Sequence, residues 1–240
     1  MKRALKILFI AAVCMTFQRS VFATPSTQIW NPSTDIQASG TVHLGIDNYF
    51  TTAWPVSNFG GTLFPTDINL TYGLVPGIEV GIDSFMPSSN QFTFNAKFGI
   101  PEGDILPALA FGFFNFGFDT LDGEKSSDQN IVYSVMAKTF RIGRVSAGYY
   151  SGNRDVLVDE FGDAQNTGLI LTWDKTITDK IWTCVDYASG YSVNGMLFGG
   201  LSYAFAPNTS VIFGYGTFNN GHAPGATTSP VMTMQLDINI

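Results

Sequence analysis

The chain has 240 residues, of which 45% are hydrophobic and 13% are charged. Nineteen Asp and Glu against 12 Lys and Arg give a net charge of −7 at pH 7. This acidic balance excludes the basic surface that nucleic-acid binding requires, and the length suits one all-β domain.

The first 23 residues predict a secretory signal peptide. Three basic residues lead into an apolar run from about residue 7 to residue 17, and Val21 and Ala23 precede the expected cut before Thr24. The apolar run is too short to cross ~30 Å of hydrocarbon, which argues against a membrane anchor. We therefore expect a cleaved leader at 1–23 and one domain at 24–240.

Removal of the leader changes both the charge and the cysteine content. The leader holds four of the 12 basic residues and no acidic residue, so eight basic and 19 acidic residues remain, a net charge of −11. Cys14 is lost with the leader, which leaves Cys184 as the one cysteine. An internal disulfide is thereby excluded.

Alternating apolar and polar residues predict strands along the whole of the remaining chain. In NLTYGLVPGIEVGID, residues 69–83, two such runs flank a Val-Pro-Gly turn, which is typical of a β-hairpin. The expected strands lie near 38–50, 66–75, 78–86, 91–100, 106–118, 130–140, 144–152, 166–175, 179–188, 195–205, 210–218 and 230–240. In the fifth of these, Phe113 adjoins Phe114, and this break in alternation requires a bulge.

The connections between the expected strands alternate in length. Short turns such as VPG, PEGDI, RIG, KTIT and APNT alternate mostly with longer polar loops such as TTAWPVSNFGGTLFP and NNGHAPGATTS. With an even number of strands, both ends of the domain fall on the short-turn side. The pattern predicts an all-β fold, a closed antiparallel up-and-down transmembrane β-barrel of about 12 strands.

A soluble sandwich is the alternative, because it would also bury the apolar faces. The opposite faces of the strands carry small or polar residues, which suits a wetted lumen better than a dry core. Closure is also required in a membrane, since an open sheet edge in hydrocarbon leaves unpaired N–H and C=O groups.

Parity along the strands predicts which side chains face the lumen and which face lipid. His43 is the expected polar lumen residue. The charged lumen candidates are Asp47, Asp67, Glu79, Asp83, Lys97, Lys138, Asp174, Asp186 and Asp237. Aromatic residues near strand ends suggest two interfacial belts, one with Phe50, Phe85, Tyr149, Tyr187 and Tyr215 and one with Tyr72, Phe98, Trp173, Tyr203 and Phe205.

Three segments resemble the single-chain outer-membrane barrels of Gram-negative bacteria, specifically small porin-like barrels. They are the hairpin LTYGLVPGIEVGID, the tract DKIWTCVDYASG followed by GGLSYAFAPNTSVIFGYG, and the last strand VMTMQLDINI. The last strand is similar to the C-terminal signal read by the barrel-assembly machinery, although Ile240 replaces the usual final aromatic residue. The resemblance implies a location in the outer membrane, with the lipid bilayer and that machinery as partners.

The expected function is a narrow passive channel for small polar solutes that prefers cations. Inward Gly, Ser and Thr residues leave room, and the excess of inward acids attracts positive charge.

Two alternatives remain open. One is a non-conducting surface barrel whose long loops, with Trp54 and Phe59, bind a partner or an envelope component. The other is an envelope hydrolase in which His222 in the last loop pairs with Asp47 and activates water. We expect no catalytic residues, no metal and no cofactor, and the protein is not expected to be an enzyme.

Overall fold

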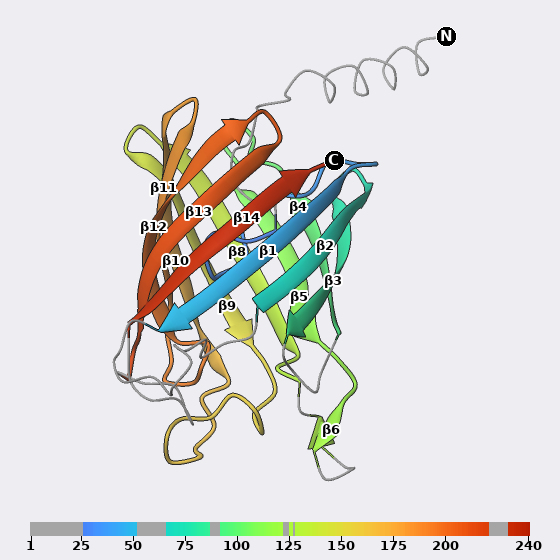
Figure 1. Cartoon of the computed structure of the whole chain (residues 1–240), viewed down its shortest axis with the longest axis vertical. Coiled ribbons are helices and arrows are strands. Elements are labelled where there is room, and N and C mark those ends of the chain that lie inside the picture. Colours follow the sequence, from blue (N-terminus) through green and yellow to red (C-terminus); the bar gives the residue numbers. More distant parts are fainter. Residues whose placement is uncertain (1–25, 52–65, 87–91, 122–124, 127, 221–229) are drawn as a thin grey trace.

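The computed structural model describes residues 26–51, 66–86, 92–121, 125–126, 128–220 and 230–240. Twelve antiparallel strands form a closed barrel in the order β1-β14-β13-β12-β11-β10-β9-β8-β5-β4-β3-β2 (Figure 1). These strands are β1 Val42–Thr51, β2 Thr66–Val75, β3 Ile78–Met86, β4 Thr93–Ile100, β5 Ala108–Phe116, β8 Ile131–Phe140, β9 Gly143–Ser151, β10 Thr167–Thr178, β11 Ile181–Ala188, β12 Met196–Ala206, β13 Thr209–Phe218 and β14 Val231–Asn239. Between β5 and β8, β6 Thr120–Leu121 pairs with β7 Lys125–Ser126.

Among the described residues, no helix is both long enough and apolar enough to span a membrane.

The ring closes between the first and last strands. β1 and β14 pair from His43↔Asn239 to Thr51↔Val231. Beyond this ladder, the Val42 N–H donates to the Ile240 carbonyl at 2.9 Å, and the Ile240 N–H donates to the Val42 carbonyl at 2.8 Å. The predicted closed 12-stranded barrel is therefore confirmed, and the two-sheet sandwich is wrong.

Each of the 12 predicted strands is present, and two boundaries differ from the prediction by three residues or more. β1 begins at Val42 rather than near residue 38, because residues 38–41 form an exposed turn in which the Thr41 N–H donates to the Ala38 carbonyl at 3.0 Å and Gly40 has a φ of 79°. β10 continues to Thr178, so the predicted KTIT turn is strand and the chain reverses at Asp179 and Lys180.

The bulge in β5 lies at Phe114 and Asn115. The β4–β5 register shifts between Phe94 and Ala96, and Asn115 has a φ of 50°, in the left-handed region. After this shift, Phe116 again lies opposite a β4 residue, Phe94, and the inward–outward alternation of the strand resumes. In the pairing with β8, Phe113 lies opposite Val132 and Phe114 opposite the buried Ile131, so adjacent aromatic residues take opposite faces.

The outer face of the barrel is apolar, as lipid contact requires. Side chains such as Leu70, Leu171 and Phe213 remain 47–49% exposed in the isolated chain. The aromatic residues of the two predicted belts share this outward parity, with one exception. Phe85 has the parity of Glu79 and lines the lumen.

The N-terminal segment folds back inside the ring of strands. Residues 26–38, here called the lumenal hairpin, form a turn in which the Gln28 N–H donates to the Asn31 carbonyl at 2.7 Å. Thr27 and Pro32 are bridged in antiparallel fashion. Figure 1 shows this segment in blue within the barrel. The hairpin enters from the short-turn end, and at its tip the Trp30 indole N–H reaches the Asn194 carbonyl in the 189–195 loop at the opposite end.

Candidate functional site in the barrel lumen

Asp186 on β11 holds the tip of the lumenal hairpin. Its Oδ2 accepts hydrogen bonds from the backbone N–H groups of Ile29, Trp30 and Asn31 at 3.2, 2.8 and 2.9 Å. Its Oδ1 accepts from Asn31 Nδ2 at 2.6 Å and from Thr172 Oγ1 at 3.1 Å. This fully buried carboxylate therefore accepts hydrogen bonds from three backbone N–H groups that would otherwise be unpaired in the lumen.

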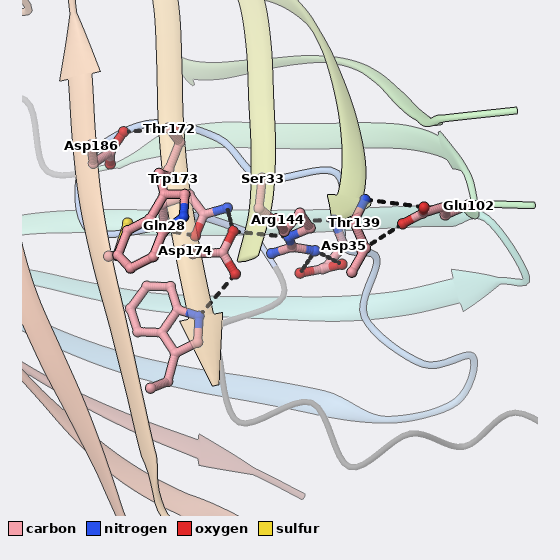
Figure 2. Close-up of polar contacts among 12 residues, drawn as sticks. Gln28, Ser33, Asp35, Glu102, Thr139, Arg144, Thr172, Trp173, Asp174 and Asp186 are labelled. Atoms are coloured by element: carbon pink, nitrogen blue, oxygen red, sulfur yellow. Dashed lines mark hydrogen bonds and ion pairs between the residues drawn. The ribbon is translucent and has the colours of Figure 1, made fainter. Parts of the chain in front are cut away.

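Arg144 on β9 joins the returning arm of the hairpin to the barrel wall. Its Nη1 lies 2.7 Å from Asp35 Oδ1, and its Nε lies 2.9 Å from Asp174 Oδ1 (Figure 2). Asp174 Oδ2 also accepts from the Trp182 indole N–H at 3.1 Å, and its Oδ1 accepts from Gln28 Nε2 at 3.4 Å. One arginine thus pairs with an acid of the wall and an acid of the hairpin.

A buried ion pair supports both arms of the hairpin. Lys97 Nζ lies 3.1 Å from Glu79 Oε1, and both side chains are 2% exposed. Glu79 also accepts from Ser26 Oγ at 2.8 Å and from the Gln37 N–H at 2.6 Å, while Lys97 donates to the Ser26 carbonyl. The charge of Lys97 is therefore fully engaged within the barrel.

Glycines on the inner face give the hairpin room. A Cβ at Gly73 would collide with the carbonyl oxygen of Ala38, and a Cβ at Gly200 would lie 2.8 Å from Ile29 Cδ1. The small inward residues therefore do not all widen a passage, because some of them accommodate this segment.

The lumen has an apolar side as well as a polar one. Ile29 of the hairpin packs with buried residues of β11 to β14, and Trp30 packs against Tyr49 and Phe198. Members of this cluster are Ile29, Trp182, Cys184, Met196, Phe198, Ile212, Phe218 and Val231. This half of the barrel is filled by side chains.

A cavity of about 310 Å³ remains between the hairpin and the opposite wall. Inward side chains of β1 to β5 and of β14 supply most of its lining, and Ser26 to Trp30 close the other side. The acids that line it are Asp47, Asp67, Glu79, Asp83, Asp128 and Asp237, whereas its basic side chains are Lys97 and His43.

The structure separates the predicted lumen residues into two groups. Asp47, Asp67, Asp83 and Asp237 face the cavity, as does His43, whose Nε2 lies 3.5 Å from Asp237 Oδ1. The others hold the hairpin in place: Glu79, Lys97, Asp174 and Asp186. Glu79 and Lys97 belong to both sets, since they also line the cavity.

Lys138 does not face the lumen, contrary to the prediction. It shares the outward parity of Val132 and Met136 on β8, and its Nζ binds Glu102 Oε1 at 3.1 Å. Burial alone would raise the pKa of Glu102, but hydrogen bonds from Thr139 and Lys138 outweigh it and lower this pKa. Lys138 therefore secures the 101–107 turn instead of lining a passage.

Sequence reasoning missed the lumenal hairpin and Arg144. Two signals pointed to them: Asp174 and Asp186 have no basic neighbour on the inner faces of their own strands, and Arg144 shares inward parity with Gly148. The acids required donors from elsewhere in the chain.

Several predictions lie outside the described residues. These are the leader cleavage site, the loop residues Trp54 and Phe59, and His222 of the hydrolase alternative. Among the described residues, no group of three or more His, Cys, Asp or Glu side chains is arranged to hold a metal ion.

The fold resembles solved outer-membrane porins. The structure described as "KdgM porin" matches with a TM-score of 0.50 and 10% sequence identity, covering 82% of this chain and 98% of that chain. A "NanC porin structure in rhombohedral crystal form" matches with a TM-score of 0.46, 11% identity and coverage of 81% and 98%. No family model and no curated protein matches the chain. At such identity the likeness shows the fold, that of a porin-type β-barrel.

Proposed function

We propose that this protein is a narrow, passive outer-membrane channel for small polar solutes, with a preference for cations. In this proposal, solutes pass along the β1–β5 side of the lumen, because the lumenal hairpin and the apolar cluster fill the other side. The proposal is a transport function without catalysis.

The observation that carries the proposal is the charge around the cavity. Six acids line it, while Lys97 is engaged by Glu79 and His43 lies beside Asp237. Carboxylates in a confined, low-dielectric passage attract cations and repel anions.

The test is ion selectivity in planar bilayers. The refolded protein should conduct, and in a KCl gradient its reversal potential should lie toward the potassium equilibrium potential. Asp47→Asn/Asp67→Asn should reduce the permeability ratio of K⁺ to Cl⁻ several-fold. A matched pair, Asp104→Asn/Asp163→Asn, removes two exposed acids outside the cavity and should leave the ratio unchanged. A barrel that never conducts would refute the channel.

The lumenal hairpin favours a second candidate, a non-conducting surface barrel whose long loops bind a partner or an envelope component. Hydrogen bonds to Asp186 on β11, Glu79 on β3 and Arg144 on β9 hold the hairpin across the lumen. Absence of conductance in the full chain, together with conductance after deletion of residues 27–37, would support this candidate instead.

The route to the membrane belongs to the same proposal. Export would use the leader at residues 1–23, and recognition by the barrel-assembly machinery would use β14. The supporting feature is the alternation in β14, where Met232 and Met234 are each 41% exposed on the outside while Thr233 and Gln235 are each 1% exposed on the inside. Replacing Met232 and Met234 by Asp should lower the amount of protein recovered in outer membranes, and equal recovery would contradict the role of β14.

A further inference from the structure

We propose that the cavity binds linear aliphatic amines that carry two or more ammonium groups. This inference deepens the proposed function, because it names a solute class for the same cavity. It starts from the arrangement of four acids on adjacent strands.

The four acids form a continuous row on four adjacent strands of the wall. Asp47 lies directly opposite Asp67 in the β1–β2 register. Asp83 is two residues from the partner of Asp67, and Asp237 is two residues from the partner of Asp47. The row, Asp237-Asp47-Asp67-Asp83, is therefore a shallow arc across β14, β1, β2 and β3, whose two outer acids share one register level, two residues from the level of the central pair.

Repulsion between neighbouring carboxylates makes such a row unfavourable unless positive charge lies along it. Like charges directly opposite one another on neighbouring strands are destabilising. No basic residue of the described chain forms an ion pair with Asp47, Asp67 or Asp83, and only His43 approaches Asp237. A bound cation would supply the missing counter-charge.

Unpaired acceptors at the same place point to a ligand that donates hydrogen bonds. Asp47 Oδ1 and Asp67 Oδ1 are buried and have no hydrogen-bond partner among the described residues. Thr93, opposite Asp83 in the β3–β4 register, is 4% exposed, lines the cavity and has an unpartnered Oγ1. Ammonium groups donate three hydrogen bonds each and can satisfy such oxygens.

Aromatic rings favour an organic cation over a bare ion. Tyr49 is two residues beyond Asp47 on the same face of β1, and Phe85 lies opposite Asp67. Trp30 of the hairpin tip meets Tyr49 edge to face, with ring centroids 5.5 Å apart. Ring faces attract ammonium groups and also pack against methylene chains.

The shape of the row favours a linear ligand over a compact one. Four adjacent strands span three interstrand spacings, roughly 14 Å at about 4.8 Å each. The described acids do not converge as metal ligands would. The cavity volume of about 310 Å³ is that of a small-molecule site.

Isothermal titration calorimetry on the full chain, refolded in a neutral detergent, tests the inference. The probe is spermidine, a linear amine with three ammonium groups. Hexaamminecobalt(III), a compact ion of the same charge, is the matched comparison. We expect spermidine to bind at least tenfold more tightly than hexaamminecobalt(III). Equal affinities would show a site for any cation and would overturn the ligand class.

Variants locate the site. Asp47→Asn/Asp67→Asn should weaken spermidine binding at least tenfold, and Asp104→Asn/Asp163→Asn should leave it within twofold. Phe85→Leu should weaken spermidine binding while hexaamminecobalt(III) binding stays the same. This third variant keeps the inference testable if the paired Asn variant does not refold, as judged by circular dichroism.

The outcomes separate the inference from the channel function. If the protein binds spermidine through Asp47 and Asp67 but never conducts, the amine site is supported and the channel function is refuted. If the protein conducts with a cation preference but does not bind spermidine, the channel function is supported and the amine site is refuted.

Discussion

At the scale of single residues, the lumenal hairpin depends on acids of the wall. Asp186 accepts three backbone N–H groups of the hairpin tip, and Glu79 accepts the N–H of Gln37. Hydrogen bonds to charged groups contribute about 1.5–3 kcal/mol each, more than neutral ones. The inner acids therefore have two separable roles, anchoring the hairpin and facing the cavity.

Asp186→Ala should release the hairpin tip. The substitution leaves the N–H groups of residues 29–31 without an acceptor, and each buried unpaired donor costs about 1–3 kcal/mol. Amide hydrogen exchange, measured by mass spectrometry on peptides covering residues 26–35, should accelerate at least tenfold. Asp163→Ala, an exposed loop substitution, serves as the control. Unchanged protection in Asp186→Ala would mean that packing of Ile29 and Trp30 suffices to hold the tip.

Lys97→Met should destabilise the barrel by about 3 kcal/mol, because it leaves the Glu79 carboxylate buried without its cation. The double variant Lys97→Met/Glu79→Leu should recover part of this loss, since no uncompensated charge remains. Urea unfolding in detergent micelles, followed by intrinsic fluorescence, measures both variants. A double variant no more stable than the single one would assign the loss to the hydrogen bonds from Ser26 and Gln37 rather than to charge.

At the scale of elements, the strands were predictable and the hairpin was not. Most strands place apolar residues outward and polar or small residues inward, so alternation indicates their positions and faces. β8 is an exception, because its inner residues Ile131, Tyr133 and Val135 are apolar and buried. The hairpin has no such period, and its contacts join residues far apart in the chain, as between Trp30 and Asp186. The apolar inner face of β8 explains the error on Lys138, because polarity assigns the two faces of this strand the wrong way round. The partners in the cavity row depend on register and not on local pattern.

Gly73→Val should displace the returning arm of the hairpin. Any side chain at this position collides with the carbonyl of Ala38, which is backbone and cannot rotate away. The variant should show faster amide exchange over residues 36–41 while the exchange of β11 stays unchanged. Gly199→Val is the matched control, because a Cβ at Gly199 meets nothing within 4 Å. Equal protection in the two variants would contradict the close approach at Gly73.

At the scale of the whole molecule, a closed ring surrounds a lumen that is partly filled by its own chain. Twelve strands leave more interior than wall side chains fill, and the hairpin with its apolar partners takes up one side. The free volume that remains is then set by the hairpin as much as by the number of strands.

Deletion of residues 27–37 should raise single-channel conductance several-fold, because it removes the segment that divides the lumen. Asp186, Asp174 and Arg144 would then face water instead of the hairpin. Single-channel recording of the deleted and full chains under identical salt conditions compares them directly. A deleted chain with the conductance of the full chain would show that the hairpin does not limit the passage.

The docking of the hairpin also depends on strands distant in sequence. Its tip binds Asp186 on β11, and Gln235 on β14 donates to the Ile29 carbonyl at 2.8 Å. Neither partner is in place until the C-terminal strands have joined the sheet. The complete set of hairpin contacts therefore requires strands from the far end of the sequence.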